Sequence, residues 1–292
     1  MHEEEAAEES LIHVAIEAEE LFAIGPLSFT NSMLGALLAT VVLLLAAWWI
    51  SRRATLLPGR LQAAIELPIE LLAGIVSASS SRWRSYVAVI IALFLMILVA
   101  NWIGLLPGVG TIGITKLDET GHEAVVPIVR PASADLNFTL GLAIVAFVMF
   151  VYWGIKAHGG WGYLKELIGQ PRYMAPLMLP INIISELSRL ISLSMRLFGN
   201  IFAGEVLIAT MLALTTAAVF VLPLAFFVPA VFLGLELLFG LVQALVFALL
   251  AMTYISVAIA EQSGHGDEHG DDHGEADAGH ADHRPAAEAA TA

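Results

Sequence analysis

The sequence contains no cysteine and few charged residues. Without cysteine, a disulfide scaffold and a cysteine-ligated zinc site are both excluded for this chain of 292 residues. Charged side chains make up 14% of the residues, well below the usual share in soluble domains, and only 13 of them are Lys or Arg. So few basic residues argue against a nucleic-acid-binding patch. Apolar residues make up 58%, and the mean hydropathy is +0.82, which together predict a membrane protein with several spans.

Most acidic residues lie near the two ends of the chain. Residues 1–20 hold eight acids and no Lys or Arg, and residues 261–292 hold nine acids with five histidines. The N-terminal stretch lacks the basic region of a cleavable signal, so we expect it in the mature protein. We predict an acidic extracytoplasmic lead-in over 1–29, a membrane domain over 30–260 and a disordered cytoplasmic tail over 261–292. For the tail, weak metal binding or pH buffering is the alternative to a plain solvated segment.

Apolar runs long enough to cross a bilayer recur in the middle region. A crossing needs about 20 residues, and runs near this length occupy residues 33–50, 86–106 and 138–155. Residues 60–78 mix charged and apolar side chains around Pro68 and predict an interfacial amphipathic helix. A polar stretch over 107–137 separates the second and third crossings.

The last third holds two helical runs that are too long to stand upright in a membrane. Residues 175–223 and 224–260 would extend roughly 70 Å and 55 Å at 1.5 Å per residue, against a hydrocarbon core of about 30 Å. Either they break, near Thr215-Thr216 and Pro229, or they form a long, steeply slanted hairpin. The predicted fold is therefore an all-α membrane protein with about five transmembrane helices and one interfacial helix.

Basic residues are divided unequally between the predicted loops. One side of the membrane receives eight of them, and the other receives only Lys116 and Arg130. Because Lys and Arg accumulate in cytoplasmic loops, the first side is predicted to be cytoplasmic. The N-terminus then lies outside and the C-terminus inside. The cytoplasmic set is Arg52, Arg53, Arg60, Arg82, Arg84, Lys156, Lys165 and Arg172.

Ionisable residues interrupt the last two apolar runs. Each costs at least about 2.5–3.5 kcal/mol at mid-membrane, so each needs a partner, water or a function. On the helix predicted over 175–223, successive residues are rotated by 100°. Five polar residues then lie within an arc of about 80° and form a polar stripe, and Glu205 lies on the opposite face. The ionisable residues are Glu186, Arg189, Arg196, Glu205 and Glu236, and the stripe is Ser185, Arg189, Ser192, Arg196 and Asn200.

Arg196 lies between carboxylates at two depths. Glu186 precedes it by about 15 Å along the helix axis and Glu205 follows it by about 14 Å. On the second run Glu236 and Gln243 share a face, and a hairpin would bring Glu236 toward Glu205 and Gln243 toward Arg196. This spacing predicts two polar access paths that Arg196 separates. The alternatives are a buried ion pair between Arg196 and one of these carboxylates, and polar side chains that only pack between helices.

The sequence around Arg196 resembles the signature helix of the a subunit of F-type ATP synthase. Residues 191–205 read ISLSMRLFGNIFAGE, preceded by SELSR at 185–189, and PASADLN stands at 131–137. The likeness continues through Gln243 and covers roughly residues 30–261. It implies a stationary, multi-pass subunit in the bacterial inner membrane whose slanted hairpin faces a ring of c subunits. The implied further partners are the b subunits of the peripheral stalk, the rest of the ATP synthase complex and the lipid bilayer, with no nucleic acid.

The resemblance also implies a role for each polar residue. Arg196 corresponds to the essential arginine that faces the ring carboxylate, with Asn200 and Gln243 beside it. Glu205 and Glu236 correspond to the proton path on the outer side. Glu186, Ser192 and Arg189 are assigned to the path on the inner side. Protons would neutralise a ring carboxylate from the outer path and leave by the inner path after nearly a full turn, which couples proton flow to rotation and ATP synthesis.

Other classes of function are less consistent with the sequence. No nucleotide-binding loop of the GxxxxGK[ST] type occurs, so we expect a channel subunit without a catalytic site, metal or cofactor. A self-contained ion-coupled secondary transporter, the main alternative, would show internal repeats and discontinuous helices, but the sequence has no repeat. An intramembrane hydrolase would need histidine within the spans, whereas every histidine is expected in a tail or loop.

Overall fold

The structure, a computed structural model, describes nine segments of the chain. They are residues 18–25, 27–53, 59–79, 82–106, 109, 113–117, 123–168, 172–217 and 222–260. Most of the acidic lead-in and the whole of the tail over 261–292 lie outside the described residues, so the expectations for these two regions stay predictions.

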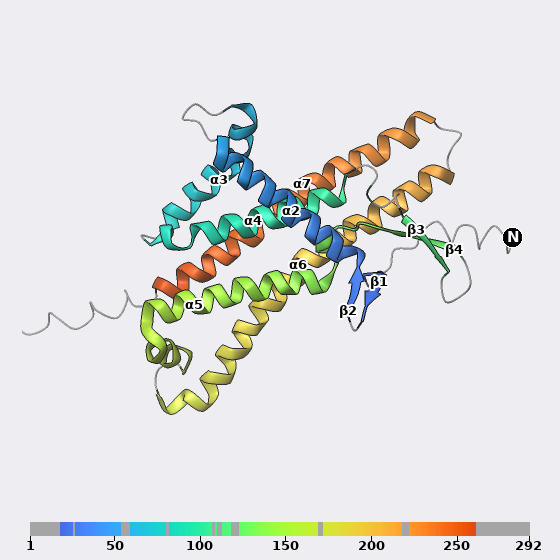
Figure 1. Ribbon diagram of the computed structural model, residues 1–292. Coiled ribbons are helices and arrows are strands. Elements are labelled where there is room, and N and C mark those ends of the chain that lie inside the picture. Colours follow the sequence, from blue (N-terminus) through green and yellow to red (C-terminus); the bar gives the residue numbers. More distant parts are fainter. Residues whose placement is uncertain are drawn as a thin grey trace, which may run out of the picture. The chain divides into compact units, whose positions relative to one another are not determined.

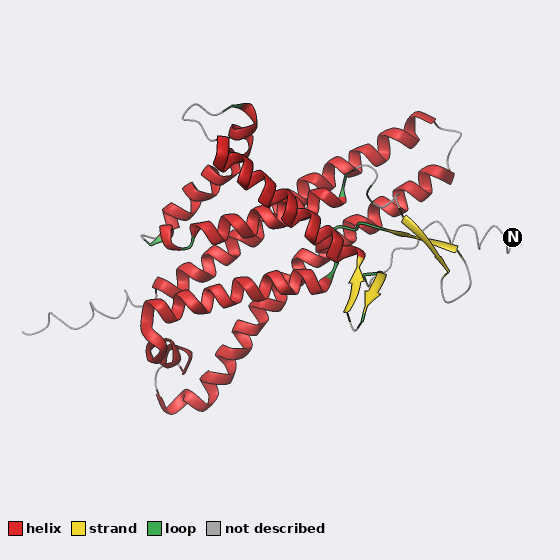
Figure 2. Cartoon of the chain, in the orientation of Figure 1, coloured by secondary structure: helices red, strands yellow, loops and turns green. Residues whose placement is uncertain are grey.

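Six α-helices and two antiparallel β-hairpins make up the described part of the chain (Figures 1 and 2). The helices are α2 (Asn31–Arg53), α3 (Arg60–Ser79), α4 (Val87–Gly104), α5 (Leu136–Ile168), α6 (Ala175–Ala217) and α7 (Leu222–Ala260). Strands β1 (Glu20–Ile24) and β2 (Leu27–Thr30) pair with each other, as do β3 (Gly113–Leu117) and β4 (Glu123–Pro127). Single 3₁₀ turns are η1 (Trp83–Ser85), η2 (Ala132–Ala134) and η3 (Arg172–Met174).

Five of the helices are long and apolar enough to cross a membrane. They are α2, α4, α5, α6 and α7, which confirms the all-α membrane fold with about five spans. The amphipathic segment over 60–78 forms α3, a helix that continues through Pro68. Its position at the membrane interface stays a prediction.

The core lies where α7 contacts three other helices. α7 packs against α4, α5 and α6, and α2 packs on the far side of α4. Mostly apolar side chains fill this contact, together with Tyr86 and Trp153, and they are packed closely as in other protein interiors. The fully buried members include Ile90, Ile97, Leu197, Phe247 and Ile255.

The two longest helices form an antiparallel hairpin, and of the two breaks that the sequence had left open the one at Pro229 is absent. α7 is continuous through Pro229, and α6 ends at Ala217, just after Thr215-Thr216. Their 43 and 39 residues extend about 65 Å and 58 Å at 1.5 Å per residue, so neither can stand upright in a hydrocarbon core of about 30 Å. Of the two alternatives, the structure therefore fits the slanted hairpin.

Two sequence-based expectations about loops are wrong. α5 does not end near residue 155 but runs to Ile168, with a kink at Gly159, where φ is 72°. His158, which was expected in a loop, is therefore part of a helix. The polar stretch over 107–137 contains the β3–β4 hairpin, in which Ile114 is paired with Val126 and Thr115 with Val125, residue types that favour strands.

Two glycines allow close contact with the segment just before α5. A Cβ on Gly35 of α2 would overlap the carbonyl oxygen of Arg130, and one on Gly104 of α4 would overlap the ring of Pro131. The absence of side chains at these glycines lets α2 and α4 hold the 130–131 segment between them. The position of the Arg130 side chain depends on this contact.

We predict that Gly35→Ala destabilises the protein by about 1–3 kcal/mol, because the new methyl group must push α2 away from a backbone oxygen. Gly141→Ala in α5 is the matched control, since nothing lies within 4 Å of the Cβ it would add. The measurement is the thermal unfolding midpoint of the two variants in the assembled, detergent-solubilised complex. Equal midpoints would contradict the close contact at Gly35.

Candidate functional site

Arg196 lies on the face of α6 that the rest of the described chain leaves uncovered. The opposite face packs into the core through Leu193, Leu197 and Ile201, which follow a spacing of four residues. Arg196 and its neighbour Met195 are exposed. Within the described residues Arg196 makes no ion pair and no hydrogen bond. No carboxylate of the described residues therefore neutralises the charge of Arg196.

Glu205 is paired with Arg130, not with Arg196. The Nε atom of Arg130 donates to Oε1 of Glu205 at 2.9 Å, and its Nη2 atom donates to Oε2 at 2.8 Å. Such two-point pairing of a guanidinium with a carboxylate is the strong, geometrically specific form of the ion pair. The Arg130 side chain is only 4% exposed and that of Glu205 24%. The buried Arg196–Glu205 pair considered from the sequence is therefore not formed.

Sequence reasoning missed the role of Arg130, which it counted only as a loop charge. One feature of the sequence could have indicated this role. Glu205 in an apolar helix needs a counter-charge, and Lys116 and Arg130 are the two cations predicted on that side of the membrane. The choice between them depends on how η2 and the segment before it fold back onto α6, and spacing along a helix does not report that contact.

Glu236 of α7 lies against the backbone of α6 next to Glu205. A Cβ added to Gly204 would be 2.5 Å from Oε1 of Glu236 and 2.7 Å from its Cδ, so the Glu236 carboxylate keeps this position only while residue 204 has no side chain. The Glu236 side chain is 6% exposed, and its Oε2 atom has no hydrogen-bond partner in the described part of the chain. The hairpin thus brings Glu236 beside Glu205, as the spacing of the two runs indicates.

The two carboxylates and Arg130 line one cavity. Its volume is about 250 Å³, and Gly104, Pro131 and Ile208 are among its other lining residues. A water molecule occupies about 30 Å³ in the liquid, so the cavity can hold several. Carboxylates that share a hydrated cavity can take up a proton and pass it on through water. This cavity is the part of the structure that suits a proton path from the side of the β3–β4 hairpin.

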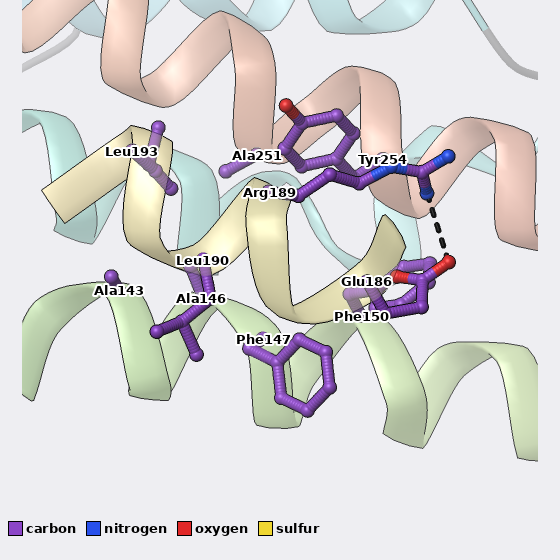
Figure 3. A pocket seen from close by; sticks show the side chains of 10 residues that line it. All are labelled: Ala143, Ala146, Phe147, Phe150, Glu186, Arg189, Leu190, Leu193, Ala251 and Tyr254. Carbon is purple, nitrogen blue, oxygen red and sulfur yellow. Dashed lines mark hydrogen bonds and ion pairs between the residues drawn. The ribbon is translucent and has the colours of Figure 1, made fainter. Parts of the chain in front are cut away.

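A second, smaller site lies farther toward the N-terminus of α6 (Figure 3). Arg189 donates from Nη1 to Oε1 of Glu186 at 3.0 Å, and its Cζ atom is 5.4 Å from the centre of the Tyr254 ring. The adjoining cavity of about 20 Å³ has room for one water. Arg189 therefore does not extend alone to the interface but shares its charge with Glu186. The apolar wall comes from α5, through Ala143, Ala146, Phe147 and Phe150.

The remaining predicted site residues are close to Arg196 without bonding to it. Gly204 opposes Glu236 and Arg189 opposes Tyr254, so the antiparallel register places Gln243 level with Arg196 and Asn200. Gln243 is buried, Asn200 is half-buried and Ser192 is exposed. No hydrogen bond joins Gln243 to Arg196 within the described segments. Those segments also contain no group of three His, Asp or Glu side chains that could hold a metal ion.

A buried polar cluster that the sequence did not indicate joins four elements near the site. Ser32 of α2 donates to Oδ2 of Asp135 at 2.6 Å, and Asp135 also accepts the backbone N–H of Asn137 at 2.9 Å. The hydroxyl groups of Thr139 in α5 and Ser194 in α6 lie 3.2 Å apart. The hydrogen bonds of this cluster fix α2, η2 and α5 around the face of α6 opposite Arg196.

The fold and these charges define a multi-pass membrane protein whose longest helical pair carries ionisable residues. Residues 33–256 match the family described as ATP synthase A chain. The chain is 37% identical over 244 residues to ATP synthase subunit a of Gluconobacter oxydans, which covers 80% of this chain and 90% of that protein. It is 32% identical over 265 residues to ATP synthase subunit a of Mycobacterium marinum, covering 88% and 99%. The chain belongs to the ATP synthase a subunit family, the proton-translocating subunits of the Fo sector.

We predict that Arg130→Gln destabilises the protein by up to about 3 kcal/mol, because it leaves Glu205 without its counter-charge. Adding Glu205→Gln removes the orphaned charge, so the double variant is expected to recover part of the lost stability. The measurement is the unfolding midpoint of the single and double variants in the assembled complex. Strictly additive losses would mean that the two side chains do not interact.

Proposed function

We propose that this chain forms two offset half-channels on either side of Arg196 and couples proton flow through them to rotation of a c-subunit ring. The observation that carries the proposal is the exposed Arg196 on α6, which has no carboxylate of its own described chain as partner. A cation within a membrane span is costly until an anion compensates it. A carboxylate on a neighbouring subunit supplies that anion.

Arg196 acts on the ring by changing which protonation state of the ring carboxylate is stable. An ionised carboxylate facing lipid is strongly disfavoured, so the ring group must be neutral there. Beside the guanidinium the ionised form is favoured, because opposite charges at short distance attract strongly in a low-dielectric environment. The ring carboxylate therefore gives up its proton each time it reaches Arg196 and must be reprotonated before it can move back into lipid.

The outer path runs through the cavity that Arg130, Glu205 and Glu236 line. Glu205 is held by Arg130, whereas one oxygen of Glu236 has no bonding partner among the described residues. We assign proton transfer to Glu236 and Glu205, with Asn200 and Gln243 as the polar groups next to Arg196. The hydrated cavity supports this assignment, because it gives both carboxylates access to water.

The inner path begins at the pair of Glu186 and Arg189. The cavity beside them has room for one water, and Ser192 lies one helical turn from Arg189 toward Arg196. Arg196 separates this path from the outer one, since its positive charge repels protons and blocks a direct leak. The transfer of one proton releases only about 2.3 kcal/mol per 100 mV of membrane potential, so the synthesis of one ATP needs the energy of several protons. A rotating ring with several carboxylates adds these energies together.

The same proposal specifies the orientation of the chain in the membrane and its partner subunits. The eight cations on one predicted side and two on the other support a cytoplasmic C-terminus and an N-terminus outside the cell. We place the chain in the bacterial inner membrane beside the c-ring, the b subunits and the rest of the complex. In that complex it is a channel subunit, and the catalytic site for ATP belongs to other subunits.

We predict that Arg196→Ala abolishes proton-driven ATP synthesis, because no positive charge remains to ionise the ring carboxylate. The amount of assembled complex is expected to stay near wild type, since Arg196 is exposed and makes no ion pair or hydrogen bond within the described chain. ATP synthesis by inverted membrane vesicles under an imposed proton gradient measures the effect, with Arg52→Ala at the exposed end of α2 as the control. Near-normal synthesis by the Arg196 variant would refute the role assigned to it.

We also predict that Glu205→Gln and Glu236→Gln each slow proton transport without uncoupling it, because each removes one proton-carrying group and leaves Arg196 in place. The measurement is the rate of passive and ATP-driven proton movement, normalised to the assembled complex. Glu70→Gln, on the exposed surface of α3, makes the same chemical change outside the cavity. Normal rates in both cavity variants would mean that the outer path runs elsewhere.

A further inference from the structure

A basic cavity lies at the N-terminal end of α4 and the C-terminal end of α7, beside the part of α5 just before its kink at Gly159, and none of the proposed proton-path residues lines it. Its volume is about 400 Å³, within the range of about 300–1,000 Å³ that is usual for small-molecule sites. The 3₁₀ turn η1 before α4, the second half of α5 and the last turn of α7 form its walls. The lining residues used below are Arg84, Lys156, Trp153, Ala157 and Ile259.

The charges on this cavity are all of one sign. Arg82, Arg84 and Lys156 line it, and the described lining residues include no carboxylate. Arg84 and Lys156 are exposed and form no ion pair within the described segments. The aromatic contacts of these two are long, with 5.5 Å from Cζ of Arg84 to the Trp83 ring and 5.7 Å from Nζ of Lys156 to the Tyr152 ring. Arg84 and Lys156 are therefore two exposed cations on one cavity wall, with no carboxylate partner among the described residues.

The position of the cavity indicates which anion it receives. Arg84 stands three residues before the first residue of α4, and Ile259 one residue before the last of α7, so the cavity lies at the end of two spans. Lipid headgroups occupy this level of a bilayer. The other walls are apolar, with Trp153 largely buried and Ala157 and Ile259 half-buried. Basic pockets between transmembrane helices bind anionic lipid headgroups, and an apolar wall suits the attached acyl chains.

We propose that this cavity binds the headgroup of an anionic phospholipid. Arg84 and Lys156 hold the phosphate, and the acyl chains run along Trp153, Ala157 and Ile259 into the bilayer. Free phosphate is also an anion, but it would contact the cations alone and leave the apolar wall uncovered. The bound lipid would connect the start of α4, the middle of α5 and the end of α7, which come from distant parts of the sequence.

The test uses the intact ATP synthase complex in nanodiscs of phosphatidylcholine that contain a photoactivatable phosphatidylglycerol with a diazirine in its acyl chain. We expect crosslinks on the peptides that contain Trp153 and Ala157. Charged groups near a membrane surface contribute additively, so Arg84→Gln or Lys156→Gln should lower apparent affinity about fivefold and the double variant about 30-fold. Crosslinking should also weaken as salt rises, because the contact is electrostatic.

Two controls separate this site from general attraction to a basic surface. Lys165→Gln removes one exposed cation from α5 outside the cavity, and it should leave the crosslinks unchanged. Arg84→Lys combined with Lys156→Arg keeps both charges and should retain binding. The proposal is overturned by unchanged crosslinks in the double Gln variant or by an equal loss in Lys165→Gln. Competition by inorganic phosphate as strong as that by short-chain phosphatidylglycerol would overturn the lipid assignment.

Discussion

The ion pair between Arg130 and Glu205 is the contact on which the functional arrangement depends. Both oxygens of Glu205 are engaged by one guanidinium that is almost fully buried. This pairing satisfies the carboxylate of α6 that could otherwise attract Arg196. Arg196 is therefore left without a carboxylate from the described chain, while Glu205 keeps a fixed position at the wall of a cavity large enough for several waters. In the proposed mechanism, this buried pair separates the cation that meets the rotor from the carboxylates that carry protons.

Small residues make this arrangement possible at three places. Gly35 and Gly104 let α2 and α4 approach the 130–131 segment, which positions Arg130, and Gly204 gives the Glu236 carboxylate its place beside Glu205. The hydrogen bonds of Asp135 to Ser32 and to the backbone of Asn137 hold the start of α5 against α2. Because these contacts are between backbone and side chains of distant segments, the geometry of the cavity depends on α2, α4 and α5 as well as on α6 and α7.

The sequence predicted the helices and the charged hairpin well, because both follow from local properties. Uninterrupted apolar length marks a span, and the cost of a charge inside one singles out Arg196, Glu205 and Glu236. The partner of Glu205 could not be read in the same way, since Arg130 is 75 positions away and helical periodicity reports one helix at a time. The helix break considered at Pro229 is absent for a related reason, because contacts with distant segments decide whether the helix continues. The packing of α7 against three helices, together with the apolar surroundings, keeps the helix continuous although one backbone hydrogen bond is missing there.

The exposure of Arg196 also decides between a subunit of a larger machine and a self-contained transporter. A transporter that works alone encloses its charged groups between its own helices, commonly where those helices are broken. Here the described parts of α6 and α7 are continuous, and the most costly charge lies on the outer surface of the helical bundle. A cation left in lipid would oppose insertion of α6 by about 2.5–3.5 kcal/mol or more, with no compensating contact from the described chain. The hairpin is therefore energetically reasonable when a second protein brings an acid to that surface, as the proposed ring of carboxylate-bearing subunits would.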